Sequence, residues 1–396
     1  MGRNRVIYQS EALYVSKNIN STGSGEHFQL TRVQSANYNF DITRQDVNQF
    51  GQLARIDALV LQSPTVSLDF SYYPTDGSNE KALGFFVTNS GGSEVRNFAS
   101  GQMGASSGQN FYIVTADEGS DLNTLPSVAE AVPNRSLVGK NAIAIGNAFL
   151  SNYTLNAAVG QLPTVSITVE GLNMQSSSIS SGTFAAFGGL TGQFANSPSI
   201  NPEVGTSLGK TGFLIDPKES TGVGFITALR PGDITLSFSA YDGQTSSPIS
   251  KLVGDGGINI QNASLTLPLS RSPIERLGSR FAFARVVDFP IVATLNVSAV
   301  VSDVTAKNLA SMLDDNTKRN ISLTIKKPDG SGSDALVYTF KGSQLKSESF
   351  SSSIGSNKTV DLVFETQVGG PTDQNNGIYL SGTHNGTING LDNWGY

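Results

Sequence analysis

The chain contains no cysteine, and it has only two histidines and one tryptophan among its 396 residues. Without cysteine it can form no disulfide framework and carry out no thiolate chemistry. Zinc sites depend mainly on cysteine and histidine. Both histidines, His27 and His384, lie in Gly-rich segments, whereas a Ser-His-Asp site needs a histidine held in a packed framework. We therefore expect no catalytic residue, no metal site and no cofactor.

Charge is also scarce. Charged residues make up 15% of the chain, the net charge is −6, and the pI is about 5.1. A globular domain usually carries about a quarter charged residues, so much of this surface is expected to be covered by partner chains. The acidic balance argues against a surface that grips nucleic acid.

Long apolar runs are absent, and so is a signal-peptide core. No run approaches the ~20 residues of a membrane span, and the first ten residues, MGRNRVIYQS, lack the hydrophobic segment of a secretory signal. We expect no membrane partner and a chain that is made and kept in a cytoplasm, at least until it assembles.

Two segments imitate ligand-binding loops. Residues 205–211 (GTSLGKT) are one residue too short for a phosphate-binding loop and lack its strand–loop–helix frame. Residues 329–334 (DGSGSD) lack the ligand series of a calcium loop and fit a hairpin turn better. Paired carboxylates of a glycosidase leave no local signature, so an enzyme stays open as an alternative that no motif favours.

One stretch of 41 residues occurs twice. Val33–Tyr73 aligns without a gap to Ile260–Val300 at a constant offset of 227. The hydrophobic pattern is shared, because alternating apolar positions fall on apolar positions in both copies. The identical positions are Gln34/Gln261, Ala36/Ala263, Arg44/Arg271, Gly51/Gly278, Val60/Val287, Leu68/Leu295 and Ser71/Ser298.

A second block repeats with a different offset. Leu150–Glu170 aligns to Leu345–Glu365 at an offset of 195, so the first copy carries 227 minus 195, or 32, extra residues. The order of the two blocks is the same in both copies, which predicts an internal duplication. The alternative, that two β-rich segments align this well by chance, stays open.

The composition, rich in Gly and in alternating Ser, Thr and Asn, predicts an all-β fold with a few short helices. The repeats predict two similar β-sandwich or half-barrel lobes. The expected organisation is an N-terminal arm 1–32, lobe one 33–171, a connecting region 172–259, lobe two 260–366 and a C-terminal tail 367–396.

Short helices are expected at few places. In each lobe a polar helical turn is expected between the first two strands, ending near Gly51 or Gly278. In lobe two this turn has a capping Ser272, Pro273 at the first helical position and Glu275 two residues later. Helices are also expected at Ser78–Phe85 and Thr305–Asp314.

Alternating apolar and polar residues predict the remaining strands. One expected hairpin, Phe225–Tyr241, turns at Arg230-Pro231-Gly232-Asp233, a type II turn by its Pro and Gly. Further strands are expected at Phe111–Thr115, Ala142–Phe149 and Thr164–Glu170, and a second hairpin joins Ile321–Lys326 to Ala335–Phe340.

Two features have open interpretations. Residues 171–202 contain no charge, which fits a long loop lying against another subunit or a flexible linker. Arg44 and Arg271 occupy equivalent positions, either as surface residues at strand ends or as a repeated structural ion pair.

The segment VQSANYNFDITRQDVNQFGQLARIDALVLQSPTVSLDFSYY resembles the N-terminal part of phage tail tube (major tail) proteins, of the type with a duplicated domain. This resemblance covers about a tenth of the chain. It implies β-sandwich subunits whose inner strands join into a barrel around a DNA channel, in trimeric rings with pseudo-sixfold symmetry.

The function that this resemblance implies is that of a virion structural protein in the phage tail, assembled in the host cytoplasm. Its implied partners are copies of itself in stacked rings, the tape measure, initiator or baseplate and terminator proteins, and a sheath in contractile tails. DNA would only pass through. The alternatives are a tail-tip or surface protein that binds carbohydrate or a receptor, and a decoration or distal tail ring protein.

Polar residues alternating away from the core suggest the channel lining. Among them the only charges are acidic, and such a surface would let DNA slide, because it would not pair phosphates. The alternative is a face merely exposed to solvent. The candidate lumen-facing residues are Asp69, Ser71, Glu170, Asp361 and Glu365.

Overall fold

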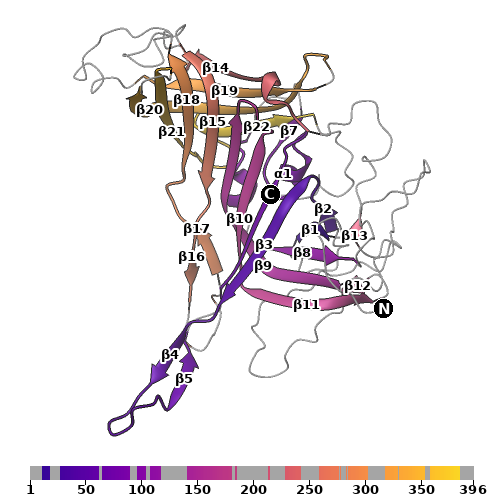
Figure 1. The fold of residues 1–396 in the computed structure, drawn as a ribbon, viewed down its shortest axis with the longest axis vertical. Coiled ribbons are helices and arrows are strands. Elements are labelled where there is room, and N and C mark those ends of the chain that lie inside the picture. The colour runs from indigo at the N-terminus through magenta and orange to yellow at the C-terminus, as the bar shows by residue number, and fades with distance from the viewer. Residues whose placement is uncertain are drawn as a thin grey trace.

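The computed structural model describes residues 11–17, 27–61, 65–89, 96–103, 108–116, 141–180, 183–184, 213–214, 228–241, 258–275, 277, 282, 284–301, 317–328, 330–352 and 357–383. In this part the chain is almost entirely β, with two short α-helices, α1 (Ser78–Ala82) and α2 (Ser100–Met103) (Figure 1). The all-β class with a few short helices is confirmed. None of the described helices is long and apolar enough to cross a membrane.

Eight antiparallel strands form the central sheet. We call the first four strands the first half and the last four the second half. In spatial order they are β3 (Val33–Asp41), β6 (Thr65–Tyr72), β10 (Thr164–Gly171), β9 (Asn141–Ala158), β15 (Ile258–Pro268), β18 (Val292–Val301), β21 (Thr359–Gln367) and β20 (Asp334–Ser351).

The two halves have the same strand order. Adding 227 to the numbers of β3 and β6 gives the start of β15 and β18 within two residues, and adding 195 to β10 gives β21. The irregularities match too. The register shifts between Val33 and Ser35 in one half and between Ile260 and Asn262 in the other. The residues skipped in pairing with β10 and β21 are Ser151 and Lys346, again 195 apart.

The strands β9 and β20 each run for 18 residues and leave the central sheet at a bend. At the bend, Asn147 (φ 50°) and Gly342 (φ 66°) adopt the left-handed conformation. The side-chain Oδ1 of Asn110 accepts the N–H of Asn147 at 3.1 Å, and that of Asn320 accepts the N–H of Gly342 at 3.3 Å. Both halves therefore make the turn with the same device.

Beyond the bends, each long strand joins a second layer. The first part of β9 pairs with β8 (Gln109–Thr115) and β11 (Asn173–Ser180), and β8 also pairs with β1 (Glu11–Lys17). The first part of β20 pairs with β19 (Arg319–Lys326) and β22 (Gly377–Gly382), and β14 (Ile234–Ala240) pairs with β19. Short strands complete these layers: β2 (His27–Gln29), β7 (Thr88–Asn89), β12 (Thr183–Phe184) and β13 (Phe213–Leu214).

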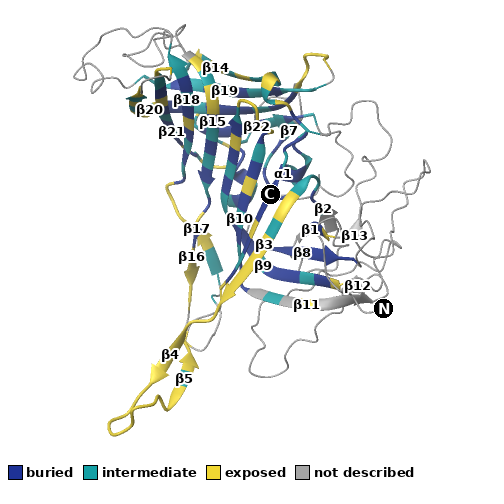
Figure 2. Cartoon of the chain, viewed as in Figure 1, coloured by how far each residue is buried: buried dark blue, intermediate teal, exposed yellow. Residues whose placement is uncertain are grey.

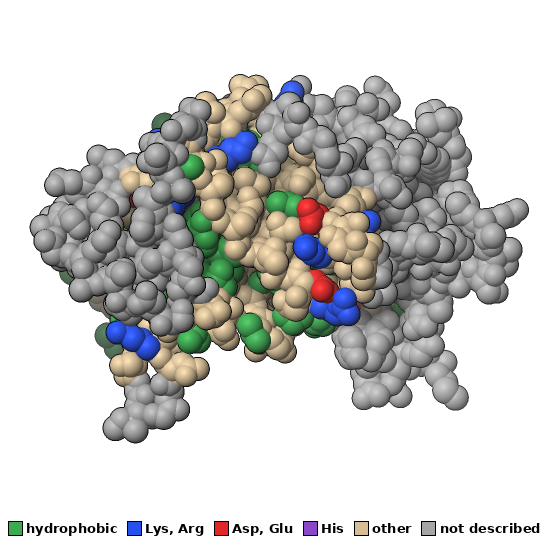
Figure 3. Space-filling view, turned by 90° about the horizontal axis from the view of Figure 1, so that it is seen from above, with side chains coloured by type: hydrophobic (Ala, Val, Ile, Leu, Met, Phe, Trp, Pro, Cys, Tyr) green, Lys and Arg blue, Asp and Glu red, His purple; other side chains and the backbone are tan. Residues whose placement is uncertain are grey.

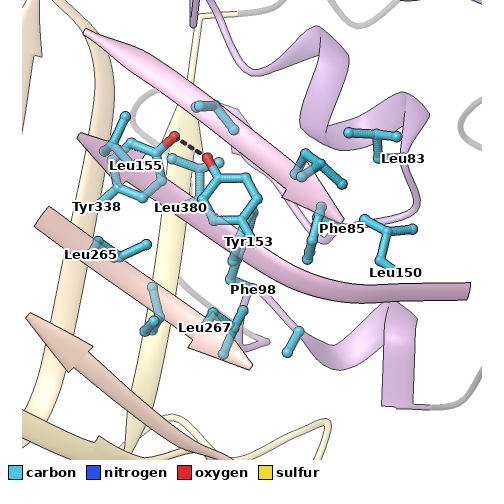
Figure 4. Packing of buried hydrophobic residues seen from close by; sticks show 14 of the residues in the cluster. Leu83, Phe85, Phe98, Leu150, Tyr153, Leu155, Leu265, Leu267, Tyr338 and Leu380 are labelled. Atoms are coloured by element: carbon cyan, nitrogen blue, oxygen red, sulfur yellow. Dashed lines mark hydrogen bonds between the residues drawn. The ribbon is translucent and has the colours of Figure 1, made fainter. Parts of the chain in front are cut away.

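Apolar side chains from both halves share one core. Phe85 and Phe98 stack at 4.2 Å between ring centroids, and Tyr153 meets both rings edge-on (Figure 4). Leu265 and Leu267 of the second half pack in the same cluster. The segment predicted to be an arm contributes as well, since Leu13 and Val15 of β1 are buried there.

The predicted helical turns are wrong. Both are hairpins, β4 (Arg44–Val47) with β5 (Asp57–Val60), and β16 (Arg271–Ile274) with β17 (Ala284–Val287). The residues that resemble a helix cap lie in strand β16 instead, where Ser272 pairs with Val286 and its hydroxyl donates to Asp288 Oδ1 at 2.6 Å. Cross-strand pairing outweighs a local capping signal.

Of the predicted Phe225–Tyr241 hairpin, the second strand is confirmed as β14 and the type II turn is wrong, while residues 225–227 lie outside the described part. β14 pairs with β19, and residues 231–233 form a 3₁₀ turn, in which Gly232 lacks the positive φ of a type II turn. The uncharged stretch 171–202 contains a strand, β11, where the sequence predicts a loop; its residues 181–182 and 185–202 lie outside the described part. The predicted helix Thr305–Asp314 lies outside it too.

The other predicted elements are confirmed. Strands β8 and β10 and the β19–β20 hairpin occur at the predicted positions. Helix α1 ends at Ala82 instead of Phe85, and β9 continues past Phe149 to Ala158.

Candidate functional site

The side of the central sheet that faces away from the core is polar. Along β6, buried residues alternate with Ser67, Asp69 and Ser71, which are partly or fully exposed. We call this side the polar face. One row of mutually paired residues crosses all eight strands, and its first six members carry hydroxyl groups. In order they are Ser35, Ser71, Ser166, Thr154, Thr266, Thr294, Glu365 and Gln344.

Three of the candidate lumen residues bond to neighbouring hydroxyls on this face. Asp69 Oδ1 accepts the hydroxyl of Thr168 at 2.8 Å. Ser71 lies 2.7 Å from the hydroxyl of Ser35, and Asp361 accepts a short bond from Ser298. These cross-strand bonds hold small polar side chains against the sheet.

The remaining two candidates are ion-paired. Glu170 Oε2 lies 2.8 Å from Arg285 Nη2, and Glu365 Oε2 lies 2.9 Å from Lys346 Nζ. Each of these two carboxylates therefore has a basic partner, Arg285 from β17 or Lys346 from β20, which alternation along the strands does not predict. Lys346 was missed because it is the bulged residue of β20, where strict alternation fails.

Few charged side chains appear among the described residues on the face that Figure 3 shows. Seen from above, the described part of the molecule shows mainly uncharged polar and backbone groups, and its acidic side chains lie beside basic ones (Figure 3). Such a surface attracts neither a polyanion nor a polycation over a long range.

The repeated positions differ in environment. Arg271 is buried, donates to the carbonyl oxygens of Gln102 and Arg285, and stacks over Phe149 at 4.3 Å. Burial, and next the neighbouring charge of Arg285, lower its pKa to about 10. Arg44, its counterpart, is exposed. Gly51 has a φ of 84° at the tip of the β4–β5 hairpin, and Gly278 lies outside the described residues.

The edge strand β3 exposes large apolar side chains. Tyr38 and Phe40 are 41% and 53% exposed although their partners on β6, Leu68 and Val66, are buried, and Ile42 just after the strand is 40% exposed. The β4–β5 hairpin continues this exposure and projects from the body (Figures 1 and 2). Phe50 and Leu53 at its tip are fully exposed. Apolar patches of this kind mark interaction surfaces.

A buried carboxyl joins the halves. Glu80 Oε1 accepts the hydroxyls of Tyr72 at 2.8 Å and Tyr153 at 3.3 Å, and Tyr153 bonds to Tyr338 of the second half at 2.7 Å (Figure 4). Burial raises the pKa of Glu80 to about 7, and the hydroxyl bonds partly oppose this. Sequence reasoning missed this cluster, because Tyr153 and Tyr338 are 185 residues apart.

The described residues hold no group of three or more His, Asp or Glu placed for a metal ion. The features that the described residues do form are a polar face, the two edges of the central sheet and an apolar hairpin.

Comparison with known proteins adds little. No protein family model matches the chain, and no curated protein matches it. One solved structure that resembles it is the SPP1 tail tube, determined by solid-state NMR and cryo-electron microscopy, at 16% identity and a TM-score of 0.29. The match covers 48% of this chain and 95% of that one.

Proposed function

We propose that this chain is a virion structural protein that forms the tube of a phage tail. Three chains close into a ring with pseudo-sixfold symmetry, rings stack, and the polar face lines a channel through which DNA is delivered. The two halves of the central sheet are products of an internal duplication, and each half supplies one sixth of the wall.

One observation carries this proposal. The central sheet contains the same four-strand unit twice, joined edge to edge by β9 and β15 in a single chain. A unit that pairs with its own copy in this way is able to pair again with the next copy. Repeated pairing of a twisted sheet closes into a barrel, which removes the exposed edges.

The assignment of the inner wall follows from chemistry. The core covers one side of the central sheet, so the other side, the polar face, is free to face a channel. Its hydroxyl row offers no cation to bind phosphate, and the nearest bases, Arg285 and Lys346, are each paired with a carboxylate. DNA would then meet a wall that releases few counterions on contact and so holds it weakly.

This function needs no catalysis and no cofactor. The partners are copies of the same chain above and below the ring, together with the tail proteins that start, measure and end the tube. The chain acts in the virion after assembly in the host cytoplasm.

Electron microscopy of the purified protein tests the proposal. The expected result is rings or tubes with a central channel and six similar densities per ring, while sedimentation gives three times 41.7 kDa per ring. Particles without a channel that bind glycans or decorate capsids would instead favour a receptor-binding or decoration protein.

A further inference from the structure

The pairing of β9 with β15 shows how one half of the central sheet contacts the other. At the internal junction, β9 and β15 run antiparallel with Leu155 opposite Leu265 and Thr154 opposite Thr266. The amide of Leu269 extends the ladder by donating to the carbonyl oxygen of Ser151 at 2.8 Å. The register of one half against the other is therefore known.

The same positions are exposed where no second half adjoins them. Leu265 and Leu267 on β15 are each 0% exposed, because the first half covers them. Their counterparts 227 residues earlier, Tyr38 and Phe40 on β3, are 41% and 53% exposed. Strands β3 and β15 have the same apolar alternation. The greater exposure of the β3 side chains therefore reflects the absence of a neighbouring strand among the described residues.

The opposite end of the sheet offers the matching edge. Residues 344–351 of β20 pair with β21 on one side, and no described strand pairs with their other side. They correspond to residues 149–156 of β9, the strand that receives β15 at the internal junction. At both ends of the central sheet, therefore, one side of the edge strand pairs with no described strand and matches one side of the internal junction.

We propose that β3 of one chain pairs with residues 344–351 of β20 in a second copy, in the register of the internal junction. This inference rests on the proposed ring. Subtracting 227 from Leu265 and adding 195 to Leu155 places Tyr38 opposite Phe350. The same shift places Asn39 opposite Ser349.

This register also sets Phe40 opposite Glu348 on the core side, by the same shifts from Leu267 and Tyr153. Tyr38 and Phe350 meet on the core side, where aromatic pairs across strands add stability. Asn39 and Ser349 meet on the polar face. A slip by one residue would set the core-side Tyr38 opposite Ser349 or Ser351, whose side chains point to the polar face. The strand β3 also lacks the usual protection of an edge, since it contains neither Lys nor Pro.

The intermolecular contact differs from the internal one in charge. Arg285 bridges the halves to Glu170 at the internal junction, but its counterpart in the first half is Ala58. Glu365, the counterpart of Glu170, pairs instead with Lys346 of its own half. The second copy is therefore held by backbone pairing and apolar contact without an arginine bridge, and we expect the ring to open between chains before any half separates from its partner.

Disulfide cross-linking tests the register, because the natural chain has no cysteine. We expect Tyr38→Cys with Phe350→Cys, oxidised at assembling concentration, to give a covalently closed trimer under non-reducing conditions. A mixture of the two single variants should give only a dimer. The matched control, Phe40→Cys with Phe350→Cys, displaces one cysteine by two residues. Its cross-linking should be at least about tenfold lower, because Cα atoms more than about 7 Å apart cannot be bridged.

The outcomes separate the two proposals. If rings form but the Tyr38→Cys/Phe350→Cys pair does not cross-link, the proposed register is wrong. The proposal that the chain forms a tube would still stand. If neither pair cross-links and no rings form, both proposals fail. The neighbouring pair Asn39→Cys with Ser349→Cys repeats the test on the polar face, in case cysteine at 350 prevents folding.

Discussion

The buried carboxyl of Glu80 makes the stability of the fold depend on pH in a direction that can be calculated. Its pKa is about 7 in the folded chain and 4.5 in the unfolded one. Below pH 4.5 both states are protonated and no penalty arises. Between pH 4.5 and 7 the unfolded chain releases its proton while the folded chain keeps it, so stability falls as pH rises. Above pH 7 the loss is complete.

The size of the loss follows from the shift. One pKa unit corresponds to about 1.4 kcal/mol, so the difference between 4.5 and about 7 amounts to about 3 kcal/mol. The groups that face Glu80 are Tyr72, Tyr153, Tyr338 and Asp76. The pKa values of the three tyrosines are raised by burial, so they stay neutral over this range.

The assay compares Glu80→Gln with the natural chain by urea unfolding from pH 4 to 8. Glutamine keeps an oxygen for both tyrosine hydroxyls but does not titrate. The stability of the variant relative to the natural chain should therefore rise by about 3 kcal/mol between pH 4.5 and 8. The control Glu275→Gln removes one exposed carboxylate and should show no such rise. A flat difference between Glu80→Gln and the natural chain would refute a buried, protonated Glu80.

The other predictions concern the sheet and its faces. Ile167→Pro should abolish folding or assembly, because β10 pairs on both sides; tubes of normal appearance by electron microscopy would refute this. Gly342→Val should lower the free energy of unfolding by at least ~1–2 kcal/mol, since φ is positive and a Cβ would lie 2.6 Å from Asn376, whereas Asn147→Gly at the matching bend should be nearly neutral in the same urea titration. Asp69→Lys with Asp361→Lys should leave tubes intact but slow DNA delivery, most at low salt; an unchanged rate at every salt concentration would remove the polar face from the channel.

Alternation predicted most of the central sheet but not its connections. Strands such as β10 were visible because every second residue is apolar and buried. The sequence predicts helical turns at both hairpins. At β16–β17 Ser, Pro and Glu at short spacing favour a helix cap, and at β4–β5 Thr43 and Asp46 give a weaker form of this signal. The capping signal lies within four consecutive residues, whereas the pairing of β16 with β17 depends on residues ten or more positions further along the chain.

Alternation predicts which side chains of the central sheet face away from the core, but it does not predict which strands form the edges of the sheet. The positions of Asp69, Ser71 and Asp361 followed from alternation, and the structure places them on one polar face. The exposure of Tyr38 and Phe40 could not be foreseen, because it depends on which strand adjoins β3. The bond between Tyr153 and Tyr338 joins segments whose proximity no local pattern encodes.

Cryo-electron microscopy of assembled tubes at a resolution that separates strands is the most direct test of the account. The proposed assembly predicts three chains per ring and a closed barrel of 24 strands, eight from each chain. Tyr38 of one chain should lie opposite Phe350 of the next, with the polar face inside the barrel. Six chains per ring, or a wall in which β3 and β20 of neighbouring chains do not meet, would contradict it.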